Sequence, residues 1–444
     1  MRKKNSCCNK YFAGQEFLET GDRSGMLRRM STGSFGQVGE HFRRLTRPQR
    51  HAFLASFLSW SLDALDFFLL IMCIPAIAGE FHTPVSSVAD AVFLTLVFRP
   101  VGAFLFGAMA DRFGRKPTLI VNILCYSLIE LGCAFAPSLP VLLVLRALFG
   151  IAMGGVWGVG AALTFETLPK EGRGVFSGIL QEGYAVGYLL AAASFGLLFH
   201  WIGWRGLFMV GAAPALLVFF VESHVEESPA WIEARKRKAA ETQKLPVLRN
   251  LLTYAPTFLF LIVLMSAFCS FSHGTQDIYP TFLLKGRGFT AGMVGLLGVI
   301  YNVGSLAGGF VFGTLSERWG RKRAIITAAL LAIPIAPLFA YGHSPLMLGA
   351  GAFLMQFMVQ GAWGVVPAYL TELSPGPVRA IFPGLAYQLG NLLTSRNLKL
   401  QELLKEWIGS YPPVLAGTVI AVALSLALIT ACGRESRGVE LEAG

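Results

Sequence analysis

The sequence predicts an all-α membrane protein with about twelve transmembrane helices, arranged as two pseudo-symmetric halves of six helices each. Three observations support this fold class: the composition, a series of long apolar runs, and an internal repeat. Of the 444 residues, 54% are hydrophobic and only 14% are charged, whereas an ordinary soluble domain carries about 25% charge. The hydrophobic residues number roughly 240, which suffices for about twelve spans of roughly 20 residues each. This composition excludes a soluble enzyme.

Twelve apolar runs occur along the chain, and each is long enough to cross a bilayer. The first six lie near residues 52–79, 86–110, 117–136, 139–165, 174–199 and 204–222. The second six lie near residues 253–284, 291–315, 323–342, 345–371, 378–395 and 412–432. The run near 378–395 is short and a polar stretch follows it, which leaves open whether it crosses the bilayer completely.

Lysine and arginine in short loops indicate the orientation of the spans. The loops after the first, third and ninth runs contain neither residue. Basic residues instead occupy the loops after the second and eighth runs: Arg112, Arg115, Lys116, Arg318, Arg321, Lys322 and Arg323. We therefore expect a multi-pass protein of the cell (cytoplasmic) membrane with both termini in the cytoplasm.

These runs and loops predict five parts of the chain. They are a basic cytoplasmic tail (1–50), an N-terminal six-helix half (51–222), a central cytoplasmic loop (223–250), a C-terminal six-helix half (251–433) and a cytoplasmic tail (434–444). The first tail lacks the short apolar core and cleavage site of a signal peptide. We interpret it as a flank near anionic lipid rather than a nucleic-acid-binding segment. Because its first stretch shows no periodicity, we hypothesise that Met26 or Met30 is the true start.

An eleven-residue segment recurs at a constant distance along the chain. Residues 106–116, FGAMADRFGRK, return 206 positions later as 312–322, FGTLSERWGRK. A second group of matches has the same offset: Trp157/Trp363, Glu166/Glu372, Pro169/Pro375, Arg173/Arg379, Phe176/Phe382 and Gly178/Gly384. One offset over two separate segments indicates duplicated, parallel halves.

The repeated segment resembles the signature that the major facilitator superfamily carries between its second and third helices. Arg146 with Gly150 resembles a second motif of that superfamily. The resemblance implies two six-helix halves around a central cavity, and a latch on the cytoplasmic side that breaks during alternating access. A plain topology anchor is the alternative reading of the two loops.

Physical reasoning supports a latch at these positions. Gly107 and Gly313 allow helices to approach closely, and Asp111 can meet a helix N-terminus. The residues that we expect to act in gating are Gly107, Asp111, Arg112, Gly114, Arg115, Arg146, Arg173, Gly313, Glu317, Arg318, Gly320, Arg321 and Arg379.

Ionisable residues inside the apolar runs are costly and therefore candidates for function. They are Asp63, Asp66, Arg99, Glu130, Arg146, Glu182, His273 and Asp277. Arg99 cannot lose its proton, so it needs an anionic partner or an anionic substrate. Pairing with Asp63 or Asp66 is the structural alternative to binding a carboxylate substrate in bidentate fashion. Glu130 has no partner that the sequence identifies.

The seventh run contains the densest polar group, CSFSHGTQDIYPT at 269–281. His273 and Asp277 are four positions apart and share one helix face. Together they form a group whose protonation can change near neutral pH, as coupling to a proton requires. A mutually satisfied structural cluster is the alternative.

This segment resembles the signature of the lactate/pyruvate:proton symporters related to the yeast Jen-type permeases, with Cys269 in place of Asn. The resemblance implies a short monocarboxylate as the substrate, whereas composition and spacing alone predict only an anion and a proton. We expect substrate contacts from Arg99, His273, Thr275, Gln276 and Asn302. We expect proton coupling through Asp66, His273, Asp277 and Glu182.

The predicted function is proton-coupled uptake of a short monocarboxylate such as lactate or pyruvate. The partners would be that anion, a proton and the lipid bilayer, and the protein would be a monomer without a cofactor or metal. A symporter of sialic acid or another organic anion is the alternative, and a transporter-like nutrient sensor a remote one. No enzyme activity is expected, because no convergent catalytic set occurs.

Overall fold

The computed structural model describes residues 39, 41–240, 249 and 252–441. It divides into two compact units, Met1–Arg44 and Leu45–Gly444, and the description below concerns the second unit. The hypothesis about Met26 or Met30, and most of the basic tail 1–50, lie outside the described residues. Every regular element within the described ranges is helical, which confirms the predicted fold class.

The first four apolar runs form four long helices. These are α3 (Arg47–Glu80), α4 (Val85–Phe113), α5 (Arg115–Ala134) and α6 (Leu139–Thr167). A capping box starts α3, because the side chains of Thr46 and Gln49 each accept a hydrogen bond from the other's backbone N–H. Gly114 joins α4 to α5 with a φ of 113°, a conformation that favours glycine.

The fifth and sixth runs form one long, interrupted stretch. It contains α7 (Arg173–Gln181), α8 (Gly183–Gly211), η1 (Ala213–Leu216) and α9 (Leu217–His224). Gly203 interrupts α8 with φ 62° and ψ −172°, between the predicted runs that end at 199 and begin at 204. The stretch has 52 residues, about 78 Å of helix, and the hydrocarbon core is about 30 Å thick. Two crossings therefore fit.

The central polar segment contains a short helix, α10 (Pro229–Ala240). Its start is capped by Ser228, whose hydroxyl accepts a hydrogen bond from the N–H of Trp231 at 3.1 Å. The seventh run then forms α12 (Ala255–Gln276), α13 (Tyr279–Thr281) and the π-helical turn η2 (Phe282–Gly286).

The remaining runs form the last group of helices. These are α14 (Ala291–Trp319), α15 (Arg321–Tyr341), α16 (Pro345–Trp363), α17 (Val366–Leu373), η3 (Gly376–Val378), α18 (Phe382–Thr394), α19 (Asn397–Ile408) and α20 (Tyr411–Cys432). The uncertain run near 378–395 is α18, and α19 extends it after a break at Ser395 and Arg396. Together they cover residues 382–408, about 40 Å of helix.

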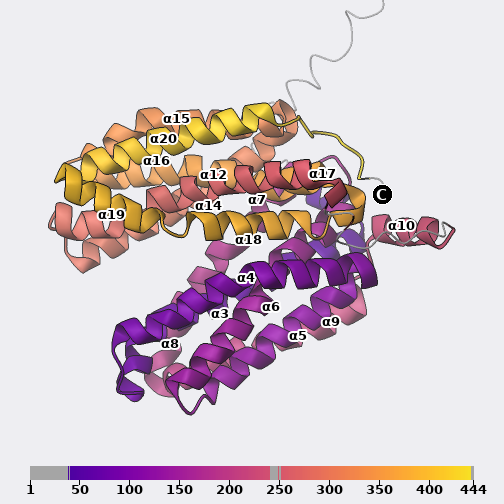
Figure 1. The fold of residues 1–444 in the computed structure, drawn as a ribbon, viewed down its shortest axis with the longest axis horizontal. Coiled ribbons are helices and arrows are strands. Elements are labelled where there is room, and N and C mark those ends of the chain that lie inside the picture. Colours follow the sequence, from indigo (N-terminus) through magenta and orange to yellow (C-terminus); the bar gives the residue numbers. More distant parts are fainter. Residues whose placement is uncertain (1–38, 40, 241–248, 250–251, 442–444) are drawn as a thin grey trace, which may run out of the picture. The chain divides into compact units, whose positions relative to one another are not determined.

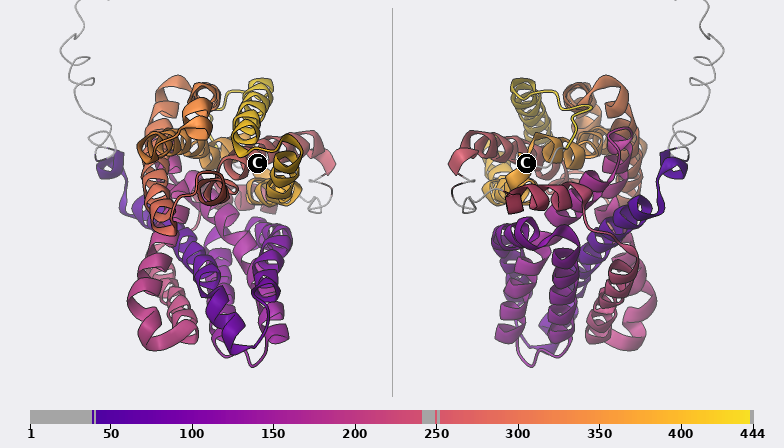
Figure 2. Two further views of the ribbon diagram at one scale, coloured as in Figure 1. Left: turned by 90° about the vertical axis from the view of Figure 1, so that its left-hand side faces the viewer. Right: turned by 90° about the vertical axis from the view of Figure 1, so that its right-hand side faces the viewer.

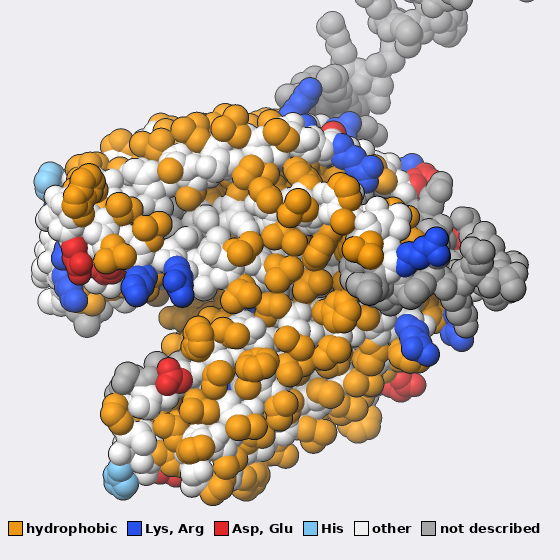
Figure 3. Space-filling model, viewed as in Figure 1, with side chains coloured by type: hydrophobic (Ala, Val, Ile, Leu, Met, Phe, Trp, Pro, Cys, Tyr) orange, Lys and Arg blue, Asp and Glu red, His pale blue; other side chains and the backbone are white. Residues whose placement is uncertain are grey.

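Among the described residues, ten helical stretches are long and apolar enough to cross a membrane. Arg173–His224 counts once among the ten although two crossings fit within it. The interrupted pair α18–α19 is not among them. With these two additions the stretches correspond to the twelve predicted runs. Figure 3 shows hydrophobic side chains along the length of the helices and most charged side chains near their ends.

The helices pack in two groups, which Figures 1 and 2 show in indigo to pink and in red to yellow. Within the first group α4 packs on α6 and α3 on α8, and within the second α14 packs on α16 and α15 on α20. Between the groups, α4 contacts α18 and α7 contacts α14. Glycines permit the α4–α6 crossing, because a Cβ at Gly150 or Gly154 would run into the α4 backbone.

Candidate functional site

A central cavity of about 910 Å³ lies between the two groups of helices, and Figure 3 shows the hollow. Its walls come from α3, α4, α7, α8, α12, α14, α16 and α18. On α4 the lining residues lie between Val92 and Arg99, whereas Gly107 and Asp111 nearer the basic loop contact the chain just before α18. The cavity is therefore closed on the side of the basic loops.

Arg99 lies at the wall of this cavity and is nearly fully buried, with 3% of its surface exposed. Its Nε and Nη2 atoms have no hydrogen-bond partner, and its guanidinium carbon lies 6.0 Å from the centre of the Tyr387 ring. No ion pair joins Arg99 to Asp63 or Asp66 within the described part of the chain. A buried guanidinium with free donors is suited to an incoming anion.

His273 and Asp277 also line the cavity, on the α12 side. The Nδ1 atom of His273 lies 3.0 Å from Oδ2 of Asp277, and its Nε2 atom lies 3.3 Å from Oδ1 of Asn391 on α18. Both ring nitrogens therefore face an oxygen, so the imidazole can carry a proton on each nitrogen. Nearby, Gln276 accepts a hydrogen bond from the hydroxyl of Tyr301 at 3.0 Å.

The other two predicted substrate residues occupy different positions. Asn302 lines the cavity but its amide already donates to the Gly298 carbonyl at 2.8 Å. Thr275 is fully buried, and its hydroxyl donates to the carbonyls of Phe271 and Ser272. It is not among the residues that line the cavity.

Three cavity residues with unused polar atoms were not predicted from the sequence. Gln388 on α18 has no partner for either amide atom, and the Nε2 of Gln356 and the Nε1 of Trp363 on α16 also lack partners. All three side chains are more than nine-tenths buried. The sequence does contain a signal for two of them, because glutamine, a polar residue, stands at positions 356, 360 and 388 inside apolar runs.

A second group of charges lies inside the first group of helices, away from the cavity lining. Arg146 on α6 forms a fully buried ion pair with Glu130 on α5, and its guanidinium lies 4.5 Å from the Phe149 ring and 5.1 Å from the Phe208 ring. Arg146 is thus the partner of Glu130 that the sequence did not identify. Arg146, expected to act in gating, lies within one half instead of at the contact between the halves.

Two acidic residues of α3 accompany this ion pair. Asp63 and Asp66 are fully buried, and none of their carboxyl oxygens has a hydrogen-bond partner. A Cβ at Gly211 would meet the carboxyl group of Asp66 and the Cγ of Glu130, so these two side chains lie near one another.

Replacing Glu130 by alanine is expected to destabilise the protein by about 3–5 kcal/mol, because it leaves the buried charge of Arg146 uncompensated. The measurement is unfolding of the purified protein in detergent with increasing dodecyl sulfate. Glu226→Ala, at an exposed position, is the control and should unfold like the parent. Equal stability of the two variants would contradict a structural role for the pair.

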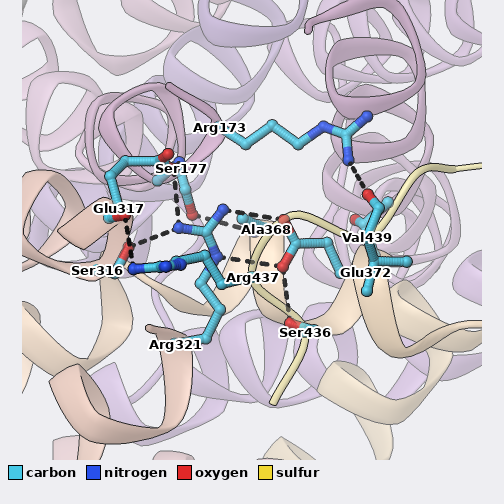
Figure 4. A network of polar contacts seen from close by, with 12 residues as sticks. Arg173, Ser177, Ser316, Glu317, Arg321, Ala368, Glu372, Ser436, Arg437 and Val439 are labelled. Atoms are coloured by element: carbon cyan, nitrogen blue, oxygen red, sulfur yellow. Dashed lines mark hydrogen bonds and ion pairs between the residues drawn. The ribbon is translucent and has the colours of Figure 1, made fainter. Parts of the chain in front are cut away.

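The predicted latch forms two matching networks, one for each copy of the repeat. In the second copy, Arg321 is held between two carboxylates, and Figure 4 shows this arrangement. Its Nη1 atom lies 2.8 Å from Glu317, and its Nε and Nη2 atoms donate to both oxygens of Glu372 at 3.1 and 2.9 Å. Ser436 donates to the same carboxylate at 2.7 Å.

The first copy repeats this arrangement. Arg115 lies 3.1 Å from Asp111 and donates to both oxygens of Glu166 at 2.9 and 2.8 Å. Ser228 donates to Glu166 at 2.5 Å. Each bidentate pair is buried, a geometry that stabilises an arginine strongly.

Two further glutamates cap the helices that begin in these loops. Glu227 accepts from the backbone N–H of Arg115 at 2.9 Å, and Glu435 accepts from that of Arg321 at 2.8 Å. Burial raises the pKa of Glu227, while the backbone donors act in the opposite direction. The sequence analysis missed these two glutamates because Glu227-Ser228 and Glu435-Ser436 are 208 positions apart, whereas the rest of the repeat has an offset of 206.

The acidic residues of the two loops also reach across to the opposite half. Glu317 accepts hydrogen bonds from the backbone N–H groups of Gly172, at 3.1 Å, and Gly174, at the start of α7. Asp111 accepts from the N–H of Ala380, just before α18, at 3.4 Å. Carboxylates at helix N-termini are stabilised by the exposed N–H groups and the helix dipole.

Glycines bring the backbones together at the same places. A Cβ at Gly313 would lie 2.6 Å from the Gly174 carbonyl oxygen, and one at Gly107 would lie 2.8 Å from Cα of Ile381. The residues that were expected to act in gating therefore occupy different kinds of position. Gly107, Asp111, Gly313 and Glu317 contact the opposite half, while Arg112 and Arg318 have exposed side chains.

Other residues that were expected to act in gating form turns or contact neighbouring segments of the chain. Gly114 and Gly320 form the turns at φ 113° and 95°. Arg379 lies 3.9 Å from Glu166. Arg173 donates to the carbonyl of Val439 in the tail after α20 at 2.9 Å.

The tail makes one more contact with the first half. Lys170 and Glu440 form an exposed ion pair at 2.8 Å. This pairing raises the pKa of Lys170 and lowers that of Glu440. The tail after α20 thus reaches the loop that precedes α7.

Glu182 lies between the latch and the cavity, at the break between α7 and α8. It is buried, and neither carboxyl oxygen has a partner. A Cβ on Gly309 of α14 would run into its carboxyl group. The neighbouring Gln181 and Tyr184 line the cavity. No group of three or more His, Cys, Asp or Glu residues in the described ranges could hold a metal ion.

Comparison with known proteins identifies this architecture. The family model described as Major Facilitator Superfamily matches residues 56–395. The chain belongs to the major facilitator superfamily. The resemblance seen in the repeated loops is thereby confirmed at the level of the superfamily.

Curated relatives resemble the chain over most of its length. A carboxylic acid transporter protein homolog of Saccharomyces cerevisiae is 29% identical over 376 residues, which cover 80% of this chain. The chain spans only 61% of that protein's length. The sialic acid transporter of Escherichia coli is 27% identical over 403 residues, covering 89% of this chain and 96% of that protein.

A solved structure of the superfamily has the same fold. The proton:xylose symporter XylE, in complex with 6-bromo-6-deoxy-D-glucose, superposes with a TM-score of 0.73 over 89% of this chain and 98% of that one. The sequences are 19% identical, so this similarity concerns the fold alone.

Proposed function

We propose that this member of the major facilitator superfamily is a secondary active transporter that takes up a short monocarboxylate, such as lactate or pyruvate, together with a proton. The observation that carries this proposal is Arg99, a buried cation with unpaired donors at the wall of the central cavity. Arg99 binds the carboxylate, and the unpaired amides of Gln356 and Gln388 are available for the hydroxyl or keto oxygen. The name of the yeast relative agrees with a carboxylate substrate.

His273 and Asp277 carry the proton in this scheme. They share a hydrogen bond and face the same cavity as Arg99, so a proton on this pair offsets part of the charge that the anion brings. One anion and one proton are electroneutral together, so the membrane potential does no net work. A pH difference of one unit supplies roughly 1.4 kcal/mol, or about tenfold accumulation. Asp66 and Glu182, both buried without partners, are further sites of protonation.

Alternating access would proceed by movement of one half, 51–222, against the other, 251–433. With the predicted topology, the closed latch lies on the cytoplasmic side and the cavity opens outward. Substrate and proton would enter in this state, and the latch would then break. The protein would act as a monomer in the cell membrane with both termini in the cytoplasm, and without a cofactor.

The test is uptake of labelled lactate into proteoliposomes with an imposed pH gradient or an imposed potential. Symport predicts uptake that responds to the pH gradient. Uptake driven by potential and indifferent to pH would refute the coupling scheme. A nutrient sensor would show binding without uptake.

A larger organic anion is the second candidate, favoured by the size of the cavity. Its volume of about 910 Å³ exceeds what a three-carbon acid fills, and a relative is named as a sialic acid transporter. Competition of unlabelled sialate against labelled lactate distinguishes the two. Strong inhibition by sialate together with slow lactate uptake would favour the larger substrate.

Replacing His273 by alanine, or Asp277 by asparagine, is expected to abolish accumulation against a gradient, because the pair then loses its exchangeable proton. Exchange of labelled for unlabelled anion needs no net proton movement and should persist. The measurement is uptake at several external pH values beside an exchange assay. Glu226→Ala, at an exposed position away from the cavity wall, serves as the control. An unchanged pH dependence in the His273 variant would reject its role.

A further inference from the structure

A second hollow of about 660 Å³ lies where α14 ends, α15 begins and the chain leaves α20. Basic side chains surround it: Arg318, Lys322, Arg323 and Arg437. The side chains of Arg318, Arg323 and Arg437 are exposed. This place is at the helix ends, where a membrane-spanning protein meets the lipid headgroups.

The four cationic side chains of the hollow outnumber its one carboxylate, that of Glu435. The side chains of Arg318 and Arg323 form no hydrogen bond or ion pair with any described residue. Lys322 and Arg437 donate to backbone carbonyls, those of Ala431 and of Glu317 and Arg318. Glu435 lines the same hollow, but its carboxylate accepts backbone N–H groups at the start of α15.

One side of the hollow is apolar. Trp319 is 47% exposed, and Ile326 is half-buried on the next helix. Tryptophan at such a level is typical of the membrane–water interface. The combination of four cations with an exposed indole fits a molecule that carries both a negative headgroup and a hydrocarbon chain.

The corresponding place in the first half keeps apolar side chains, with Phe113 and Ile120 in the positions of Trp319 and Ile326, but it has fewer cations. Arg112 and Lys116 match Arg318 and Lys322, but Pro117 stands in the position of Arg323, and Pro229 in that of Arg437. Lys116 also lies 3.8 Å from the carboxylate of Glu222. The duplicated chain therefore provides an internal control, in which the fold is kept and two of the four cations are missing.

We propose that this hollow binds the phosphate headgroup of an anionic phospholipid, with an acyl chain lying against Trp319. The site is separate from the substrate cavity and does not depend on the identity of the transported anion. Arg437 belongs to the tail that also bonds Arg173 and Lys170 of the first half. A bound headgroup would therefore hold the tail in place and favour the closed latch.

The experiment measures lipid binding to the purified full-length protein by native mass spectrometry. Dioctanoyl phosphatidylglycerol is the probe, and dioctanoyl phosphatidylcholine and inorganic phosphate are the comparisons. The variant Arg318→Gln/Arg323→Gln/Arg437→Gln is compared with Arg112→Gln/Lys116→Gln from the first half. Arg323→Gln alone changes one exposed side chain that has no hydrogen bond or ion pair with a described residue. It therefore still tests the site if the triple variant fails to fold.

We expect phosphatidylglycerol affinity to fall at least about tenfold in the triple variant and about threefold to fivefold in Arg323→Gln. The first-half variant should stay within about twofold of the parent. Equal losses in both halves would show a general surface charge effect and overturn the proposal. So would equal binding of phosphatidylcholine, or displacement of the lipid by an equal concentration of inorganic phosphate.

Discussion

Replacing Arg99 by alanine is expected to abolish uptake of the anion while the protein remains folded. Arg99 is buried beside the cavity with two donor atoms unpaired and forms no ion pair with Asp63 or Asp66, so its removal leaves no described carboxylate without its ion-pair partner. Loss of one partner of a desolvated charge pair costs about 2–5 kcal/mol, which corresponds to a decrease in affinity of roughly 30-fold or more. Binding to the purified protein and uptake in proteoliposomes measure the two effects.

Two further variants test whether the guanidinium group of Arg99 is responsible for binding the anion. Arg99→Lys keeps the charge but not the planar fork, so it should bind the anion weakly instead of not at all. Arg112→Gln removes an exposed cation outside the cavity and should leave affinity unchanged. Normal uptake by Arg99→Ala would return this arginine to a structural role and remove the main support for anion transport.

Replacing Gly313 by alanine is expected to prevent the latch from closing. A Cβ at this position would lie 2.6 Å from the carbonyl oxygen of Gly174, and backbone atoms cannot move aside as a side chain can. Overpacking of this kind costs about 1–3 kcal/mol, so the closed arrangement becomes about five to 150 times less populated. Uptake should fall, because the cycle requires both arrangements.

The state of the latch can be followed with a cysteine at Ser177, in a background without the native cysteines. Ser177 is buried on α7, where its hydroxyl accepts from the N–H of Ala368. A thiol reagent should label this cysteine faster in the Gly313→Ala protein than in the parent. Gly298→Ala, on the same helix, is the matched control, since a Cβ there meets nothing within 4 Å. Parent-like labelling and transport in Gly313→Ala would contradict the latch.

The proposed latch has two arms, one for each copy of the repeat, built around Arg115 and Arg321. Each acidic residue of the repeat meets the start of a chain segment in the opposite half, α7 for Glu317 and the residues before α18 for Asp111. Glu317 accepts from the N–H groups of Gly172 and Gly174, and Asp111 accepts from the N–H of Ala380 at 3.4 Å.

Much of this molecule was predictable because it depends on local sequence. A bilayer requires long apolar helices whose backbone groups are satisfied internally, so the runs at 52–79 and 412–432 were recognisable as helices. The offset of 206 residues revealed the duplicated halves. Arg99, His273 and Asp277 stood out because a charge in hydrocarbon is costly, and the structure places all three at one cavity.

Which side chains meet depends on how the helices cross, and only the tertiary structure decides that. Glu130 and Arg146 come from different helices, and no spacing rule joins them. Thr275 lies on the polar seventh run, yet its hydroxyl bonds its own helix, whereas Gln388 from a distant run faces the cavity with its amide free. The sequence by itself determined the helices, their duplication and the few charges in the apolar runs, because these follow from hydration of single segments. The tertiary structure decided the ion pairs, the latch contacts and the cavity wall, because these depend on the distance between atoms of different helices.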